Sequence, residues 1–150
     1  MNRLALLLVA SMNLGASVSD NLQRLEGFSG TSYVDTTGHL SVGFGHRTDK
    51  SVSMSRETAL VVLSDDIALA ERGARRLFPS FDTQPQGVRD VLVEATFQLG
   101  ASGLSKFTKF RAAIAANDYR QAASEMLASK WAKQCPNRVN ELANRIKGTL

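Results

Sequence analysis

A change from a glycine-rich segment to a long helical repeat limits the possible folds of this chain more than any other feature. Residues 27–53 combine β-favouring side chains with frequent glycines: Gly27, Gly30, Gly38, Gly43 and Gly45. From Ser55 onward, apolar residues recur at steps of three and four: Leu60, Leu63, Ile67, Ala70, Ala74 and Leu77. That spacing places them on one face of a helix. The pattern therefore predicts a small β-containing part followed by a long amphipathic helix.

The glycine-rich part contains the signature of a β-hairpin. Thr36-Thr37-Gly38 separates Tyr33-Val34 from Leu40-Ser41-Val42. Glycine accepts a positive φ without penalty, so this tripeptide favours a turn between two antiparallel strands.

The remainder of the chain is predicted to be helical. Ser55 is a suitable N-cap for the long helix, and Phe78-Pro79 should end it. Further helices are expected after Pro85 as far as Gly100, over residues 107–116 and 119–128, and from Pro136. The expected fold class is α+β and mainly helical. A β-lobe over about residues 27–54 is joined by the long helix to a helical lobe over about residues 78–150.

Length and charge set the broad class of protein. A chain of 150 residues is long enough for one domain, and its composition is that of a globular protein. The formal net charge of +4 favours anionic partners such as a bacterial wall, acidic lipid or nucleic acid, without choosing among them. Cys135 is the sole cysteine, which excludes an intrachain disulfide and a cysteine-rich metal site.

Residues 1–19 differ in character from the domain over residues 20–150. The apolar run Leu4–Ala10 follows Arg3 and precedes several small residues. This order fits a secretory signal, a releasable anchor that touches the membrane transiently through residues 4–19, or a helix docked on the domain. The three interpretations share one composition, so the choice stays open.

Three polar residues around the predicted hairpin form a candidate catalytic set. Glu26 precedes Gly27, Asp35 begins the turn, and Ser41 lies on the returning strand. Glycoside hydrolysis needs a carboxylic acid that protonates the leaving oxygen and a carboxylate that stabilises the sugar cation or activates a water. Spacing alone is weak support, because acidic residues are mostly solvated surface groups.

The wider pattern resembles the phage lysozyme family, glycoside hydrolase family 24. Its active-site motif corresponds here to Glu26-x8-Asp35-x5-Ser41 followed by Gly43-Phe44-Gly45-His46. The likeness continues through Phe97-Gln98-Leu99-Gly100 and the tail, Trp131, Gln134 and Pro136-Asn137-Arg138. It covers about residues 17–148, and it implies a lysozyme-like fold.

The resemblance also implies a mechanism and a substrate. Glu26 would protonate the β-1,4 oxygen between N-acetylmuramic acid and N-acetylglucosamine, while Asp35 and Ser41 hold a water for inverting hydrolysis. The partner would be bacterial peptidoglycan, with no nucleic acid, no cofactor and no metal, and the enzyme would act as a monomer. An endolysin-like role in host cell lysis follows, with passage from host cytoplasm to periplasm if the chain is phage-encoded.

The same resemblance suggests further site residues. Phe97 and Gln98 match substrate-contacting positions of the family, and Glu125 occupies another with altered chemistry. Arg47 follows the motif and could face the wall. His46 could act as a base or a metal ligand, but the family places a salt-bridged histidine here, with Asp66 at its partner's position.

Two departures from the family keep alternatives open. Ser41 replaces a threonine, and the gap from His46 to Asp66 is about half the usual one, which shortens the β-lobe. A lytic transglycosylase needs one acid but no water-positioning pair, so Asp35 and Ser41 count against it. A non-enzymatic basic protein that binds walls is the remaining alternative.

Overall fold

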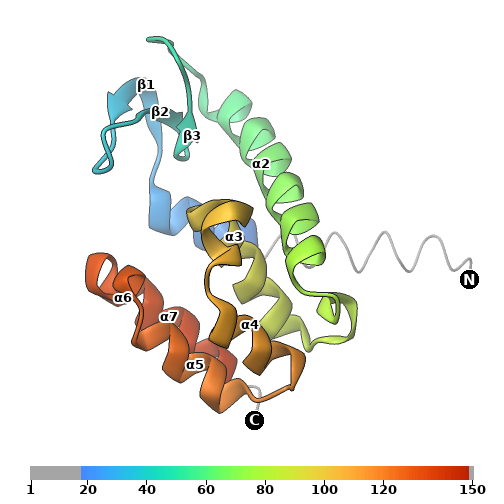
Figure 1. Ribbon diagram of the computed structural model, residues 1–150. Helices are drawn as coiled ribbons and strands as arrows, with labels where there is room; N and C mark the ends of the chain where they lie inside the picture. Colours follow the sequence, from blue (N-terminus) through green and yellow to red (C-terminus); the bar gives the residue numbers. More distant parts are fainter. Residues whose placement is uncertain (1–17, 149–150) are drawn as a thin grey trace, which may run out of the picture. The chain divides into compact units, whose positions relative to one another are not determined.

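The computed structural model describes residues 18–148, and the chain divides into two units, residues 1–68 and 69–150 (Figure 1). Most of the predicted N-terminal segment, residues 1–17, lies outside the described residues. Over the described part, no helix combines the length and the apolar character that crossing a membrane requires.

The first unit is built on a short helix and a three-stranded antiparallel sheet. Residues 18–26 are helical, and the strands β1 (Ser29–Val34), β2 (Leu40–Gly43) and β3 (His46–Arg47) follow in the order β1-β2-β3. Tyr33 pairs with Ser41 across β1 and β2, as a hairpin closed at Thr36-Thr37-Gly38 requires. The predicted hairpin is thus present. The strand β3 was not predicted, because a strand of two residues shows no alternation.

The helix α2 (Arg56–Leu77) begins and ends where the sequence predicted. The Ser55 hydroxyl accepts a hydrogen bond from the Thr58 N–H at 3.1 Å, which caps the first turn. The buried face of α2, however, begins at Ala59 and does not include Leu60. The buried residues are Ala59, Leu63, Ile67, Ala70 and Ala74, whereas Leu60 is 37% exposed. Leu60 is one position, or about 100° of helix rotation, away from Ala59, so it lies outside the face of α2 that is buried.

Besides the last residues of α2, the second unit holds five α-helices among its described residues. They are α3 (Gln86–Ser105), α4 (Thr108–Ala115), α5 (Tyr119–Leu127), α6 (Lys130–Gln134) and α7 (Pro136–Lys147). Gly100 has φ 70° and ψ 159° and interrupts α3, so the predicted break is present, but helical turns resume after it. The short α6 was not predicted. α5 packs on α4, α6 and α7, and α7 also packs on α3 (Figure 1).

The core of the second unit surrounds α3. Its residues from Asp90 to Thr96 are all buried, which is the pattern of a helix covered on every side. Among them, the Glu94 carboxylate accepts a hydrogen bond from Arg145 of α7 at 2.9 Å. The observed structure is therefore the predicted α+β fold, mainly helical with a small antiparallel sheet.

Candidate active site

Glu26 lies at the end of the first helical segment, where Gly27 turns the chain toward β1. The Gly27 N–H still donates to the Gln23 carbonyl at 3.1 Å, but its φ of 66° ends the helix. A cavity of about 300 Å³ opens beside the carboxyl group and is lined by Glu26, Gly27, Phe28, Ser29 and Tyr33. This part of the first unit can admit a ligand next to the Glu26 side chain.

Gly45 gives the Glu26 carboxyl group its space. The backbone at Gly45 has φ 78°, and a Cβ atom placed there would lie 3.1 Å from Glu26 Oε2. Any larger side chain would be strained and would also press on the carboxyl group. The Gly-x-Gly stretch of the motif therefore lets the backbone pass close to Glu26.

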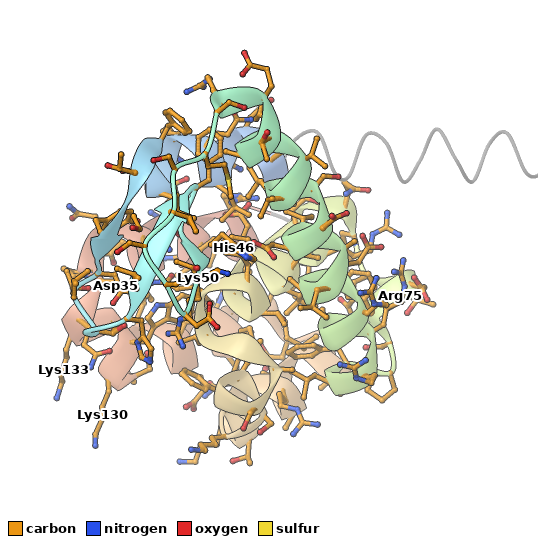
Figure 2. All side chains as sticks on the ribbon, turned by 90° about the horizontal axis from the view of Figure 1, so that it is seen from above. Asp35, His46, Lys50, Arg75, Lys130 and Lys133 are labelled. Atoms are coloured by element: carbon orange, nitrogen blue, oxygen red, sulfur yellow. The ribbon has the colours of Figure 1, made fainter. Side chains whose placement is uncertain are left out.

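Asp35 begins the hairpin turn, and its carboxylate is fixed by the turn itself (Figure 2). Its Oδ1 accepts hydrogen bonds from the Thr37 N–H at 2.8 Å, the Thr37 hydroxyl at 2.6 Å and the His39 N–H at 3.0 Å. Hydrogen bonds to the charged form favour ionisation. The Thr37 hydroxyl, followed by the His39 N–H, holds the pKa of Asp35 well below its usual range.

Ser41 approaches the other carboxylate oxygen. Its side chain is 1% exposed, and its hydroxyl donates to Asp35 Oδ2 at 3.2 Å. The two oxygens of Asp35 are thus unequal: Oδ1 receives three donors, and Oδ2 has lone-pair capacity beside the Ser41 hydroxyl. A water bound at Oδ2 could therefore contact both Asp35 and Ser41.

Tyr33 interacts electrostatically with both carboxyl groups, and it was not predicted as a site residue. Burial raises the pKa of the Tyr33 phenol, and the charges of Glu26 and Asp35 raise it further. Tyr33 also lines the cavity at Glu26. The signal in the sequence was position, since Tyr33 lies in the strand that leads into the predicted turn, two residues before Asp35.

His46 lies between the sheet and α2, where its Nδ1 is 2.8 Å from Asp66 Oδ2 (Figure 2). The two residues named from the family resemblance are therefore in direct contact. Arg47, the next residue of β3, is exposed and pairs in register with Ser41.

The other candidate residues, Phe97, Gln98 and Glu125, belong to the second unit. Gln98 Nε2 lies 3.4 Å from Cys135 Sγ, and its Oε1 is buried with no hydrogen-bond partner among the described residues. Glu125 accepts a hydrogen bond from Gln121 at 2.7 Å and lines a cavity of about 360 Å³. Phe97 and Gln98 do not line that cavity.

Comparison with known proteins finds relatives that align over most of the chain. The chain is 26% identical to "Probable T4-type lysozyme 1" and 25% identical to "Probable T4-type lysozyme 2", both from Dictyostelium discoideum. Each alignment covers 90% of this chain and 96% of the relative. The sequence model described as phage lysozyme matches residues 23–148, which include both carboxylates and most of the second unit. With that match over most of its length, the chain belongs to the phage lysozyme family, whose members are peptidoglycan-hydrolysing enzymes of the glycoside hydrolase type.

Proposed function

We propose that this protein cleaves the β-1,4 bond between N-acetylmuramic acid and N-acetylglucosamine by inverting hydrolysis, with Glu26 as general acid and Asp35 and Ser41 as the water-holding pair. The observation that carries the proposal is the different setting of the two carboxyl groups. Asp35 accepts four hydrogen bonds from Thr37, His39 and Ser41, whereas Glu26 borders an open cavity.

The setting of Asp35 supports this division of roles. A carboxyl group whose pKa lies well below its usual range stays ionised at any physiological pH, so Asp35 cannot supply a proton. In this proposal the proton donor is the other carboxyl group of the site, Glu26, which borders the cavity. Asp35 Oδ2, with the Ser41 hydroxyl, supplies a fixed negative charge and an acceptor for the attacking water.

The remaining residues are proposed for support and for binding the polymer. The contact of His46 with Asp66 links β3 to α2 and so fixes the strand next to Ser41. Arg47 is proposed to face anionic parts of the wall, and Phe97, Gln98 and Glu125 to contact the glycan or its peptide. An endolysin-like role at host cell lysis is the corresponding biological proposal.

The first test is the activity of Glu26→Gln on purified peptidoglycan. We expect a loss of at least a hundredfold, because removing a general acid costs about 10² to 10⁴ in rate. Glu57→Gln is the matched control, since Glu57 is an exposed glutamate in the first turn of α2. If Glu26→Gln stays active, or if both variants lose activity equally, the assignment of the acid is wrong.

Product analysis tests the type of reaction. Hydrolysis leaves reducing ends, and inversion gives the α-anomer first, which proton NMR detects before mutarotation. Products with 1,6-anhydro ends would instead identify a lytic transglycosylase. Binding of wall fragments by Glu26→Gln without any cleavage by the unsubstituted protein would identify a wall-binding protein.

A further inference from the structure

The turn that carries Asp35 contains a second side-chain contact, between Thr37 and His39. The backbone of this turn is closed at both ends, since Asp35 N–H donates to the His39 carbonyl at 2.8 Å and Gly38 N–H donates to the Asp35 carbonyl at 3.0 Å. The His39 Nδ1 lies 2.8 Å from the Thr37 hydroxyl oxygen. That oxygen is itself 2.6 Å from Asp35 Oδ1. The three side chains therefore form the chain His39–Thr37–Asp35.

The direction of these hydrogen bonds follows from counting protons. A hydroxyl group has one proton, and an ionised carboxylate can only accept. Thr37 must therefore give its proton to Asp35 Oδ1. At the second contact the Thr37 oxygen is then the acceptor, and His39 Nδ1 must carry the donated proton. This is the case for the imidazolium ion and for the neutral tautomer protonated at Nδ1.

We propose that His39 is a positioning residue for Asp35 and acts through Thr37. Its Nδ1–H holds the Thr37 oxygen as an acceptor and thereby directs the hydroxyl proton to Asp35 Oδ1. A neutral His39 protonated only at Nε2 would have the opposite effect, because its bare Nδ1 would compete with Asp35 for the same proton. This inference rests on the proposed function, in which Asp35 orients a water at Oδ2.

The consequence for the site is a fixed carboxylate orientation. With Oδ1 bound by the two Thr37 donors and the His39 N–H, Oδ2 stays beside Ser41. The Thr37 hydroxyl is also the largest cause of the lowered pKa of Asp35. Tyr33 and Glu26 are the titratable neighbours of Asp35 on the adjoining elements: burial raises the pKa of the Tyr33 phenol, and the charges of Glu26 and Asp35 raise it further.

The test is a titration of the Asp35 carboxyl carbon by ¹³C NMR in three His39 variants of the full chain. His39→Phe removes the donor, His39→Asn keeps one near the position of Nδ1, and His39→Gln moves it toward the position of Nε2. We expect His39→Phe and His39→Gln to raise the pKa of Asp35 toward its usual value of about 3.9, and His39→Asn to retain the lowered value. The kcat on peptidoglycan should fall roughly three- to tenfold in the first two variants, with little change in KM. The acidic limb of the pH–rate profile should move to higher pH in His39→Phe and His39→Gln, because Asp35 must be ionised for activity.

A second background tests the route through Thr37. In a Thr37→Val protein, His39→Phe should cause no further shift in the Asp35 titration. An equal shift with and without the Thr37 hydroxyl would overturn the proposal, as would unchanged titration and kcat in His39→Phe. The NMR readout is independent of catalysis. Failure of the Glu26 assignment would therefore appear as activity in Glu26→Gln, while the titration still decides the role of His39.

Discussion

Asp35 illustrates how a few local hydrogen bonds determine the behaviour of one residue. Because its pKa is lowered in the folded protein, Asp35 adds stability that is present above the unfolded pKa of about 3.9 and lost as the pH falls toward the folded value. Thr37→Val removes the largest cause of the shift. We expect the variant to unfold at lower urea concentration than the unsubstituted protein at pH 7, with the difference closing below about pH 4. A difference that stays constant from pH 7 to pH 2 would show that Thr37 acts on stability without Asp35.

Ser41 stands where the family resemblance leads us to expect a threonine, and its hydroxyl is the feature that the proposed mechanism needs. Ser41→Ala removes the hydrogen bond to Asp35 Oδ2 and should lower kcat by roughly tenfold or more. Ser41→Thr restores the hydroxyl with a stiffer side chain, so it should retain activity. Assays of both variants on the same peptidoglycan preparation give the comparison. A large loss in Ser41→Thr would mean that the enclosed site, where Ser41 is 1% exposed, has no room for the methyl group.

The turn between β2 and β3 is an element whose backbone serves the site directly. Gly45→Ala places a methyl group 3.1 Å from Glu26 Oε2 at a φ of 78°. Gly38→Ala is the matched control, because Gly38 has φ 83° and no atom within 4 Å of its missing Cβ. Both variants should lose about 1–2 kcal/mol of unfolding free energy from the left-handed backbone. Gly45→Ala should in addition lose most of its activity, whereas Gly38→Ala should keep most of it. Similar activity in the two variants would argue against a role for the close approach to Glu26.

The elements also show how far the sequence determines the prediction. The hairpin at Thr36-Thr37-Gly38 and the limits of α2 follow from local signals, namely a turn glycine and the Ser55 cap, and both were predicted. The strand β3 and the helix α6 are too short to produce a periodic pattern. Leu60 was misplaced because steps of three and four fit two neighbouring faces of a helix, and only tertiary packing selects one.

The candidate site shows the same limit at the level of side chains. Glu26, Asp35 and Ser41 were named from a motif in which their spacing is combined with the Gly43-Phe44-Gly45-His46 stretch. The roles of Thr37 and His39 depend on which atoms meet in three dimensions, and one sequence contains no signal for a 2.6 Å contact. The clearance between Gly45 and Glu26 is likewise a property of the folded chain.

For the molecule as a whole, the ion pair between Glu94 and Arg145 links the central helix α3 to the C-terminal helix α7. The Glu94 side chain is 2% exposed and the Arg145 side chain 24%, so both charges are largely shielded from water. Removing one partner of such a pair costs more than the pair contributes, because a charge stays behind in a poorly solvated site.

We expect Arg145→Met to lower the unfolding free energy by about 2–4 kcal/mol, as measured by urea denaturation. Arg120→Met on the exposed side of α5 is the control, with an expected change below about 0.5 kcal/mol. Hydrogen exchange should locate the loss of protection in α3 and α7 of the second unit and leave β1 and β2 of the first unit less affected. Equal loss of protection in both units would mean that they unfold as one cooperative body.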